Sequence, residues 1–190
     1  MDRKGLIIII SGPSGVGKTT ITHGLLSSIS GIRQCITYTT RSRRPDEEDG
    51  VDYHFVDDEA FSGLIKSGQL AEWAVINGYR YGTPKSGIER ITSSGNDVVL
   101  VIDVKGAASI KSLYPAALSI FIKPPSLDAL KERLEERGEK DRVDMRLNRV
   151  KTEMEQAHAY DYVLVNDTPD RVISSLKGII EKARGEKGDS

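Results

Sequence analysis

LIIIISGPSGVGKTT, residues 6–20, places a run of apolar residues directly before a glycine-rich segment. The spacing from Gly12 to Thr19 matches G-x-x-x-x-G-K-[ST], the pattern of a phosphate-binding loop. Glycine permits backbone conformations that a Cβ disfavours, so successive N–H groups can face phosphate oxygens at the start of a helix. The alternative is a plain glycine-rich turn, but the apolar run before the loop and the helical pattern after it are the context that the motif requires.

The residue types in this loop predict how a triphosphate is held. The ammonium of Lys18 is expected to reach the β- and γ-phosphates, and the hydroxyl of Thr19 is expected to bind Mg²⁺, the predicted cofactor. The predicted contacts with the triphosphate are Gly12, Pro13, Ser14, Gly15, Val16, Gly17, Lys18, Thr19 and Thr20.

The composition excludes several classes of protein. A length of 190 residues with 38% hydrophobic and 29% charged residues is typical of a single globular domain. The net charge of -1 argues against a general nucleic-acid or membrane-surface binder. The single cysteine, Cys35, cannot form an internal disulfide, and the short apolar run near the N-terminus is too short for a signal peptide or a membrane span. We therefore expect a cytoplasmic protein with no membrane and no nucleic-acid partner; a homo-oligomer remains open.

Residues 34–84 are predicted to be a β-rich insertion. Asp57 is expected to cap a helix whose apolar stripe is Ala60, Phe61, Leu64 and Ile65. Asn77-Gly78 lies between two strand-like runs and is a strong hairpin signal. The other elements expected up to residue 84 are a strand over 6–10, a helix over 19–29, and strands over 33–40, 52–56, 70–76 and 79–83.

The rest of the chain alternates between helices and strands. Thr83-Pro84 is expected to begin a helix that ends near Ser94, and the apolar run 97–103 is expected to be a central strand ending at Asp103. Further elements are expected at 106–113, 118–122, 127–137 with Ser126 as cap, 145–160, 162–165 and 169–183, followed by a frayed tail over 184–190. This alternation predicts an α/β fold with a parallel sheet covered by helices on both faces, built from residues 1–33, 85–137 and 145–183.

Six motifs together resemble the guanylate kinase family over about residues 5–183: GPSGVGKT, TTRSRRPDEEDGVDYHF, EWAVINGYRYGT, VIDVKG, PPS with RLEERG, and VND. That family transfers the γ-phosphate of ATP to GMP. The resemblance implies a P-loop NTPase-type core, a GMP-binding lobe at about 34–84 and a short lid at about 138–144.

The predicted hairpin places Glu72 opposite Thr83, with Tyr81 one pair away. An ionised carboxylate can accept the N1–H and N2–H₂ donors of guanine, and a hydroxyl can donate to O6. Adenine has no proton on N1 and would leave the carboxylate unpaired. A solvated strand carboxylate is the alternative reading of Glu72. The resemblance implies that both residues bind guanine and that Thr37 adds a further hydroxyl.

The resemblance also assigns residues to the GMP phosphate and to the metal. It implies phosphate contacts from Arg41, Arg44, Tyr53 and Tyr81, although a basic turn is often only a solvated surface. Asp103 is expected either to act through water on Mg²⁺ or to contact GMP, as the family match implies; a strand-end cap is the third possibility. Val101 stands where the family frequently has another aspartate.

The last set of predicted site residues lies near the lid. The resemblance implies that Arg133, Arg137 and Arg146 close over ATP as catalytic cations, and that Asn166 lies near the adenine. Glu132, Glu135 and Glu136 are interleaved, so a salt-bridged helix surface is the alternative. The sequence leaves two alternative functions. Lys18 and the loop glycines argue against a non-catalytic interaction module, and Glu72 with Thr83 argues against a small-molecule kinase with another acceptor.

Overall fold

The computed structural model describes residues 4–136 and 143–188. The chain divides into two compact units. One comprises residues 1–8, 31–100 and 105–117, and the other comprises 9–30, 101–104 and 118–190. This division does not test the predicted boundaries of core, lobe and lid, which stay predictions.

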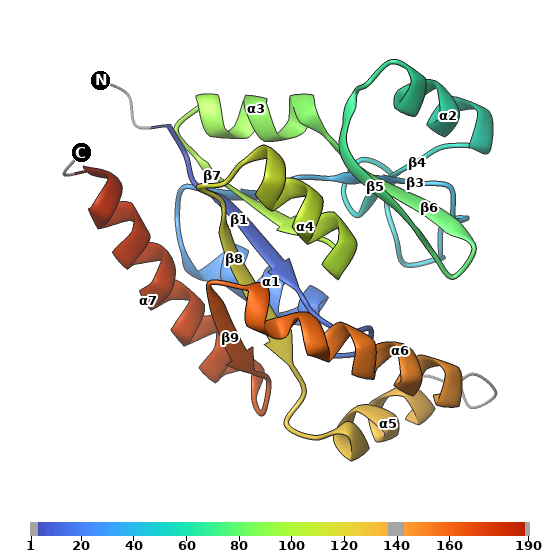
Figure 1. The fold of residues 1–190 in the computed structure, drawn as a ribbon. Coiled ribbons are helices and arrows are strands. Elements are labelled where there is room, and N and C mark those ends of the chain that lie inside the picture. The colour runs from blue at the N-terminus through green and yellow to red at the C-terminus, as the bar shows by residue number, and fades with distance from the viewer. Residues whose placement is uncertain (1–3, 137–142, 189–190) are drawn as a thin grey trace. The chain divides into compact units, whose positions relative to one another are not determined.

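One sheet of the structure has five strands (Figure 1). Its order is β2-β7-β1-β8-β9, where the strands are β1 (Ile7–Ser11), β2 (Ile32–Gln34), β7 (Asp97–Val101), β8 (Leu118–Lys123) and β9 (Tyr162–Val165). β2 pairs with β7 and β8 pairs with β9, both in parallel. Ile8, Ile9 and Ile10 are all fully buried, as expected of a strand covered on both faces. The predicted α/β class is confirmed.

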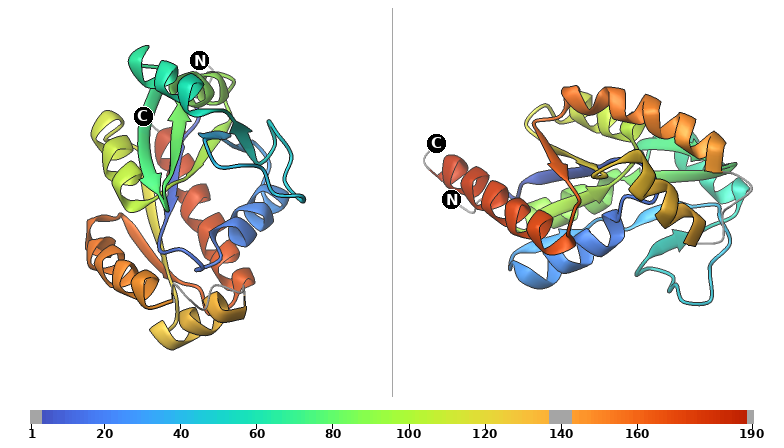
Figure 2. Two further views of the ribbon diagram at one scale, coloured as in Figure 1. Left: turned by 90° about the vertical axis from the view of Figure 1, so that its right-hand side faces the viewer. Right: turned by 90° about the horizontal axis from the view of Figure 1, so that it is seen from below.

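The second unit contains the phosphate loop and several helices. The helices are α1 (Lys18–Ser28), α5 (Leu127–Glu136), α6 (Val143–Glu155), the short 3-10 helix η2 (Gln156–Ala159) and α7 (Pro169–Gly188). Figure 2 shows α7 running beside α1, against which it packs. Leu130 of α5 and Val150 of α6 share a small apolar cluster with Met154. None of the helices in the described ranges is long and apolar enough to cross a membrane.

The first unit contains a second sheet of order β4-β3-β6-β5. The strands of this sheet are β3 (Thr37–Thr39), β4 (Tyr53–Phe55), β5 (Leu70–Ile76) and β6 (Tyr79–Pro84). The helices of the unit include α2 (Asp58–Lys66) and α3 (Lys85–Ser93), and α4 (Val104–Leu113) follows β7. Asn77 and Gly78 have φ of 53° and 86°, the left-handed values that a tight two-residue hairpin needs. Asp57 caps α2 by accepting a hydrogen bond from the Ala60 N–H, as predicted.

Four sequence-based expectations are wrong in detail. The strand expected over 33–40 is two strands in different sheets, because β2 pairs with β7 whereas β3 pairs with β4 and β6. Thr83 does not cap a helix; it belongs to β6, and Pro84 is the N-cap of α3. Ala60 is exposed rather than part of the buried stripe. Helix α7 continues to Gly188 past the point where fraying was expected.

Candidate active site

The phosphate loop connects the end of β1 to the start of α1. Its glycines Gly12, Gly15 and Gly17 have φ of 142°, 83° and 97°, which side chains with a Cβ rarely adopt. A Cβ on Gly12 would lie 2.1 Å from the carbonyl oxygen of Ile122, so the backbone approaches β8 too closely for any other residue. The position of Gly12 therefore requires glycine for both conformation and space, and the backbone conformation favours glycine at Gly15 and Gly17.

Two side chains hold the loop in shape. Lys18 donates from Nζ to the carbonyl oxygens of Gly12 at 2.6 Å and Pro13 at 3.0 Å. The buried Asn166 donates from Nδ2 to the carbonyl oxygen of Val16 at 2.7 Å. Asn166, which directly follows β9, thus stabilises the phosphate loop. The adenine contact expected from the sequence is a different contact and stays a prediction.

Charged side chains surround Lys18. Burial lowers the pKa of Lys18 to about 8; the carboxylates of Glu153 and Asp103 oppose this shift, and the Arg149 guanidinium adds to it. Arg149 Nε lies 2.8 Å from Glu153 Oε1, and its Nη2 lies 3.8 Å from Asp103 Oδ2. Two cations and two carboxylates therefore meet next to the loop, and Asp103 is one of them.

The hairpin brings Glu72 and Thr83 together as predicted. Strands β5 and β6 pair Glu72 with Thr83, Ala74 with Tyr81 and Ile76 with Tyr79. Thr83 Oγ1 donates to Glu72 Oε1 at 2.5 Å, and the two side chains are only 1% and 7% exposed respectively. The solvated-carboxylate reading of Glu72 is therefore wrong.

A cation and two phenols form a second cluster in the same unit. The Arg41 guanidinium carbon lies 5.5 Å from the centre of the Tyr53 ring, whose centroid is 5.9 Å from that of Tyr81. Arg41 Nη2 donates to Glu47 Oε1 at 2.6 Å. That hydrogen bond holds the pKa of Arg41 above its ordinary value and the pKa of Glu47 below it, and burial raises the pKa of Tyr53. Arg41 is thus a fixed cation rather than a loose surface side chain.

The other predicted acceptor residues are placed less tightly. Thr37 is buried and pairs with Tyr53 between β3 and β4. Arg44 is exposed. Its backbone N–H donates to Oε2 of Glu47 at 2.9 Å, and its Nη1 lies 4.0 Å from Oε1 of Glu47. Arg137 and residues 138–142 of the predicted lid lie outside the described residues. Arg133 lies in α5 and Arg146 in α6, but their side chains are also outside the described part.

The residues near the loop suit a magnesium ion. Mg²⁺ is usually bound by one or two protein oxygens together with waters and substrate phosphates, rather than by a complete protein cage. Thr19 is exposed at the start of α1, and the Asp103 carboxylate approaches the same loop through its charge interaction with Lys18. Within residues 4–136 and 143–188 there is no cluster of three or more His, Cys, Asp or Glu that could hold an ion alone. This donor set fits Mg²⁺ that arrives with a nucleotide.

Three site residues were missed by sequence reasoning. Glu47 orients Arg41, and Arg149 with Glu153 contributes to the charges around Lys18. Arg149 and Glu153 are four residues apart on α6, a spacing that predicts an ion pair but says nothing about proximity to the loop. Glu47 lies in an acidic run that reads as a solvated turn, so its sequence context offers no signal of its role.

Comparison with known proteins agrees with this geometry. The sequence model of the family described as "Guanylate kinase" matches residues 4–183. A guanylate kinase of Symbiobacterium thermophilum is 44% identical over 185 residues, covering 95% of this chain and 88% of the relative. A guanylate kinase of Oceanobacillus iheyensis is 45% identical over 181 residues, covering 94% and 87%. The crystal structure of guanylate kinase from Anaplasma phagocytophilum matches with a TM-score of 0.81 and 33% identity, covering 98% of this chain and 88% of that one.

The parallel sheet, the glycine loop and the partly buried lysine define a P-loop α/β protein of the kinase type. The match over most of the chain is more specific. This chain belongs to the guanylate kinase family.

Proposed function

We propose that this chain transfers the γ-phosphate of ATP to GMP, giving ADP and GDP, with Mg²⁺ bound to the triphosphate. The observation that carries the proposal is the buried hydrogen bond between Thr83 and Glu72. A carboxylate held out of water and oriented by a hydroxyl is suited to the paired donors N1–H and N2–H₂ of guanine. An adenine in the same position would offer that carboxylate no N1–H and no N2–H₂ donor, at a cost of about 1–3 kcal/mol or more.

The Arg41 cluster is assigned to the phosphate of GMP. Arg41 is held by Glu47 and by contact with Tyr53, so little side-chain freedom is lost when it binds an oxyanion. The phenols of Tyr53 and Tyr81 can donate further hydrogen bonds, and Arg44 adds positive charge from the exposed turn. Thr37 and Thr83 are assigned to the guanine, and residues 34–84 form the GMP-binding lobe in this proposal.

The loop from Gly12 to Thr20 is assigned to the triphosphate of ATP. Its amides and the Lys18 ammonium would bind phosphate oxygens, while Thr19, and Asp103 through water, would hold the metal. Bound Mg²⁺ would supply charge neutralisation on the β- and γ-phosphates. Asn166 braces the loop at Val16, so it preserves the loop's shape whether or not it also contacts adenine.

The reaction needs no general base. The phosphate of GMP is already an ionised oxyanion near neutral pH, so the protein has to align the two nucleotides and offset charge on the transferring group. Lys18 supplies part of that charge, and Arg133, Arg137 and Arg146 are assigned the rest. Exclusion of water would protect the γ-phosphate from hydrolysis.

A coupled assay of ADP release tests the proposal. With MgATP present, GMP, AMP, dTMP and a water-only blank are compared as acceptors. We expect GMP to be used at least about a hundredfold better than AMP, because adenine lacks the donors that the Glu72 carboxylate would accept from guanine. Preference for another acceptor would overturn the assignment of Glu72, and absence of ADP release with every acceptor would indicate a binding module instead.

A further inference from the structure

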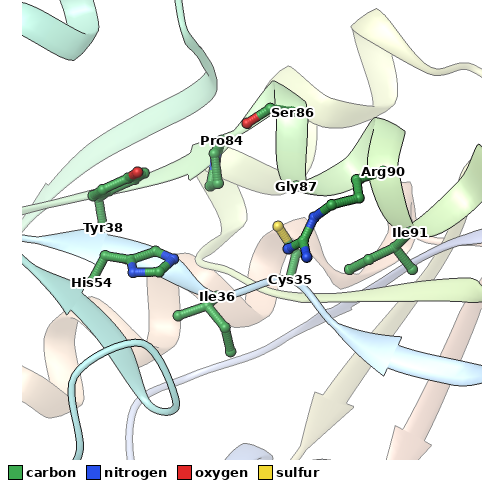
Figure 3. Close-up of a pocket in the computed structure, with 9 residues that line it drawn as sticks. All are labelled: Cys35, Ile36, Tyr38, His54, Pro84, Ser86, Gly87, Arg90 and Ile91. Carbon is green, nitrogen blue, oxygen red and sulfur yellow. The ribbon is translucent and has the colours of Figure 1, made fainter.

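A polar cavity lies in the first unit, beside helix α3 (Figure 3). Its volume is about 220 Å³, and its polar lining includes Tyr38 and His54 from the second sheet and Ser86 and Arg90 from α3. None of these residues belongs to the guanine pair, the Arg41 cluster or the phosphate loop. The cavity is therefore a separate feature.

The strand pattern places this cavity on the opposite face of the sheet from the proposed GMP site. Successive side chains of a strand point to opposite faces. Tyr38 lies between Thr37 and Thr39 on β3, and His54 lies between Tyr53 and Phe55 on β4. Tyr38 and His54 pair directly across the two strands, and their ring centroids are 4.8 Å apart. They thus form one wall that faces away from Thr37 and Tyr53.

The lining offers donors and positive charge but no carboxylate. The Arg90 guanidinium is cationic, and the side chains of His54, Tyr38 and Ser86 can each donate a hydrogen bond. Within the described part of the chain, no hydrogen bond or ion pair joins these side chains to another residue. In Figure 3, Arg90 and His54 point into the same space from opposite sides, with Cys35 between them.

Cys35 adds no negative charge to this space. Burial raises the pKa of its thiol to about 12, so it stays neutral at physiological pH. The floor is also tightly built, since a Cβ on Gly87 would lie 2.7 Å from the Cys35 sulfur. A tightly built floor, a guanidinium and three side chains that can donate hydrogen bonds are features that recognise an oxyanion.

We propose that this cavity is a second anion-binding site, which takes inorganic phosphate or a small phosphate monoester. Its ligand would connect α3 to β3 and β4. Two further lining residues, Ile36 and Pro84, directly adjoin Thr37 and Thr83 in the chain. An anion in the cavity would therefore restrain the backbone on both sides of the proposed guanine site, while remaining outside that site.

NMR of the three histidine side chains tests the site without relying on kinase activity. Inorganic phosphate is titrated into the nucleotide-free chain at constant pH and ionic strength. We expect saturable shifts at His54 and none at the exposed His158, while His23, on the helix after the phosphate loop, reports separately on that loop. Parallel shifts at all three histidines, or no shift at His54, would overturn the proposal.

Two variants identify the site that causes the His54 response. Arg90→Gln removes the charge from an exposed side chain, and we expect the apparent affinity at His54 to fall at least about tenfold. Arg41→Gln, in the proposed GMP site, should leave the His54 response unchanged. The proposal fails if Arg90→Gln, shown to be folded by its thermal transition, responds like the parent, or if Arg41→Gln abolishes the response. A failed kinase assay would leave these outcomes unaffected.

Discussion

Thr83 donates a hydrogen bond from Oγ1 to Oε1 of Glu72 at 2.5 Å, and both side chains are buried. Because the two residues are paired across the β5–β6 hairpin, their geometry is set by the backbone rather than by flexible side chains. A buried carboxylate costs free energy unless its lone pairs are matched. The hydrogen bond from Thr83 to Oε1 of Glu72 therefore fixes the orientation of the carboxylate toward a ligand.

Glu72→Gln should reduce use of GMP far more than use of ATP. Glutamine keeps the size and can still accept from Thr83, but it loses the charge that would pair with two guanine donors. We expect kcat/KM for GMP to fall about 10- to 100-fold, as for loss of a hydrogen bond to a charged group. Steady-state kinetics with each nucleotide varied in turn measure this. Equal loss on both nucleotides would remove Glu72 from the acceptor site.

Thr83→Val should destabilise the protein, whereas Thr83→Ser should not do so to the same extent. Valine has nearly the same shape as threonine but removes the hydrogen bond that Thr83 donates to the buried carboxylate, so we expect the free energy of unfolding to fall by about 1–3 kcal/mol. Serine keeps the hydroxyl and loses a methyl group, worth about 0.8 kcal/mol. Urea unfolding of both variants gives the comparison. Equal losses would mean that packing, and not the hydrogen bond, is the main contribution of Thr83.

Lys18→Ala should lower turnover by about a hundredfold or more without unfolding the chain. Among the described residues, the ammonium donates to carbonyl oxygens of its own loop, and the loop is also held by Asn166. ADP release and circular dichroism measure the two effects. The exposed Lys66→Ala, at the end of α2, is a control that should behave like the parent. Near-normal turnover of Lys18→Ala would contradict the assignment of the loop.

Arg149→Gln should disturb the charges around Lys18, and Arg149→Lys should disturb them less. The Arg149 guanidinium lowers the pKa of Lys18, whereas the carboxylates of Glu153 and Asp103 raise it. Removing the guanidinium should therefore raise the pKa of Lys18. Because Arg149 is partly exposed, we expect a stability loss of only about 1 kcal/mol. Thermal unfolding gives the stability, and the ATP dependence of turnover shows whether the bridge also affects function. A glutamine variant as stable and active as the parent would show that the bridge contributes nothing.

Cys35 should be unreactive in the folded protein. Burial raises its pKa from the ordinary 9.0 to about 12, so the thiolate that attacks alkylating reagents is rare in the native state. Since the folded pKa is the higher one, the unfolded chain loses this proton first, and stability should fall as pH rises from about 9 towards 12. Iodoacetamide labelling at pH 8, followed by mass spectrometry, should be slow until urea unfolds the chain. Rapid labelling of the native protein would be inconsistent with the buried thiol.

For Cys35, the matched variant is Cys35→Ala. It should lack this part of the pH dependence, which a comparison of urea unfolding at pH 8 and pH 10 would reveal. If the parent and the variant lose stability equally between these two conditions, groups other than Cys35 cause the loss.

Some features of this protein were determined by the sequence itself. The phosphate loop could be predicted because its glycines and Lys18 are close together in the chain and act through local backbone conformation. The pairing of Glu72 with Thr83 could be predicted because Asn77-Gly78 forms a two-residue turn, which sets the register of both strands. In both cases the physical constraint acts over a few neighbouring residues.

Only the tertiary structure decided the rest. Residues 33–40 alternate like one strand, yet β2 and β3 join different sheets, because alternation does not specify a pairing partner. The lowered pKa of Lys18 depends on burial and on Asp103, Arg149 and Glu153, which are distant in sequence. The cavity beside α3 likewise joins Tyr38 and His54 to Arg90. Burial and electrostatic environment arise when distant segments pack together, and no local pattern encodes them.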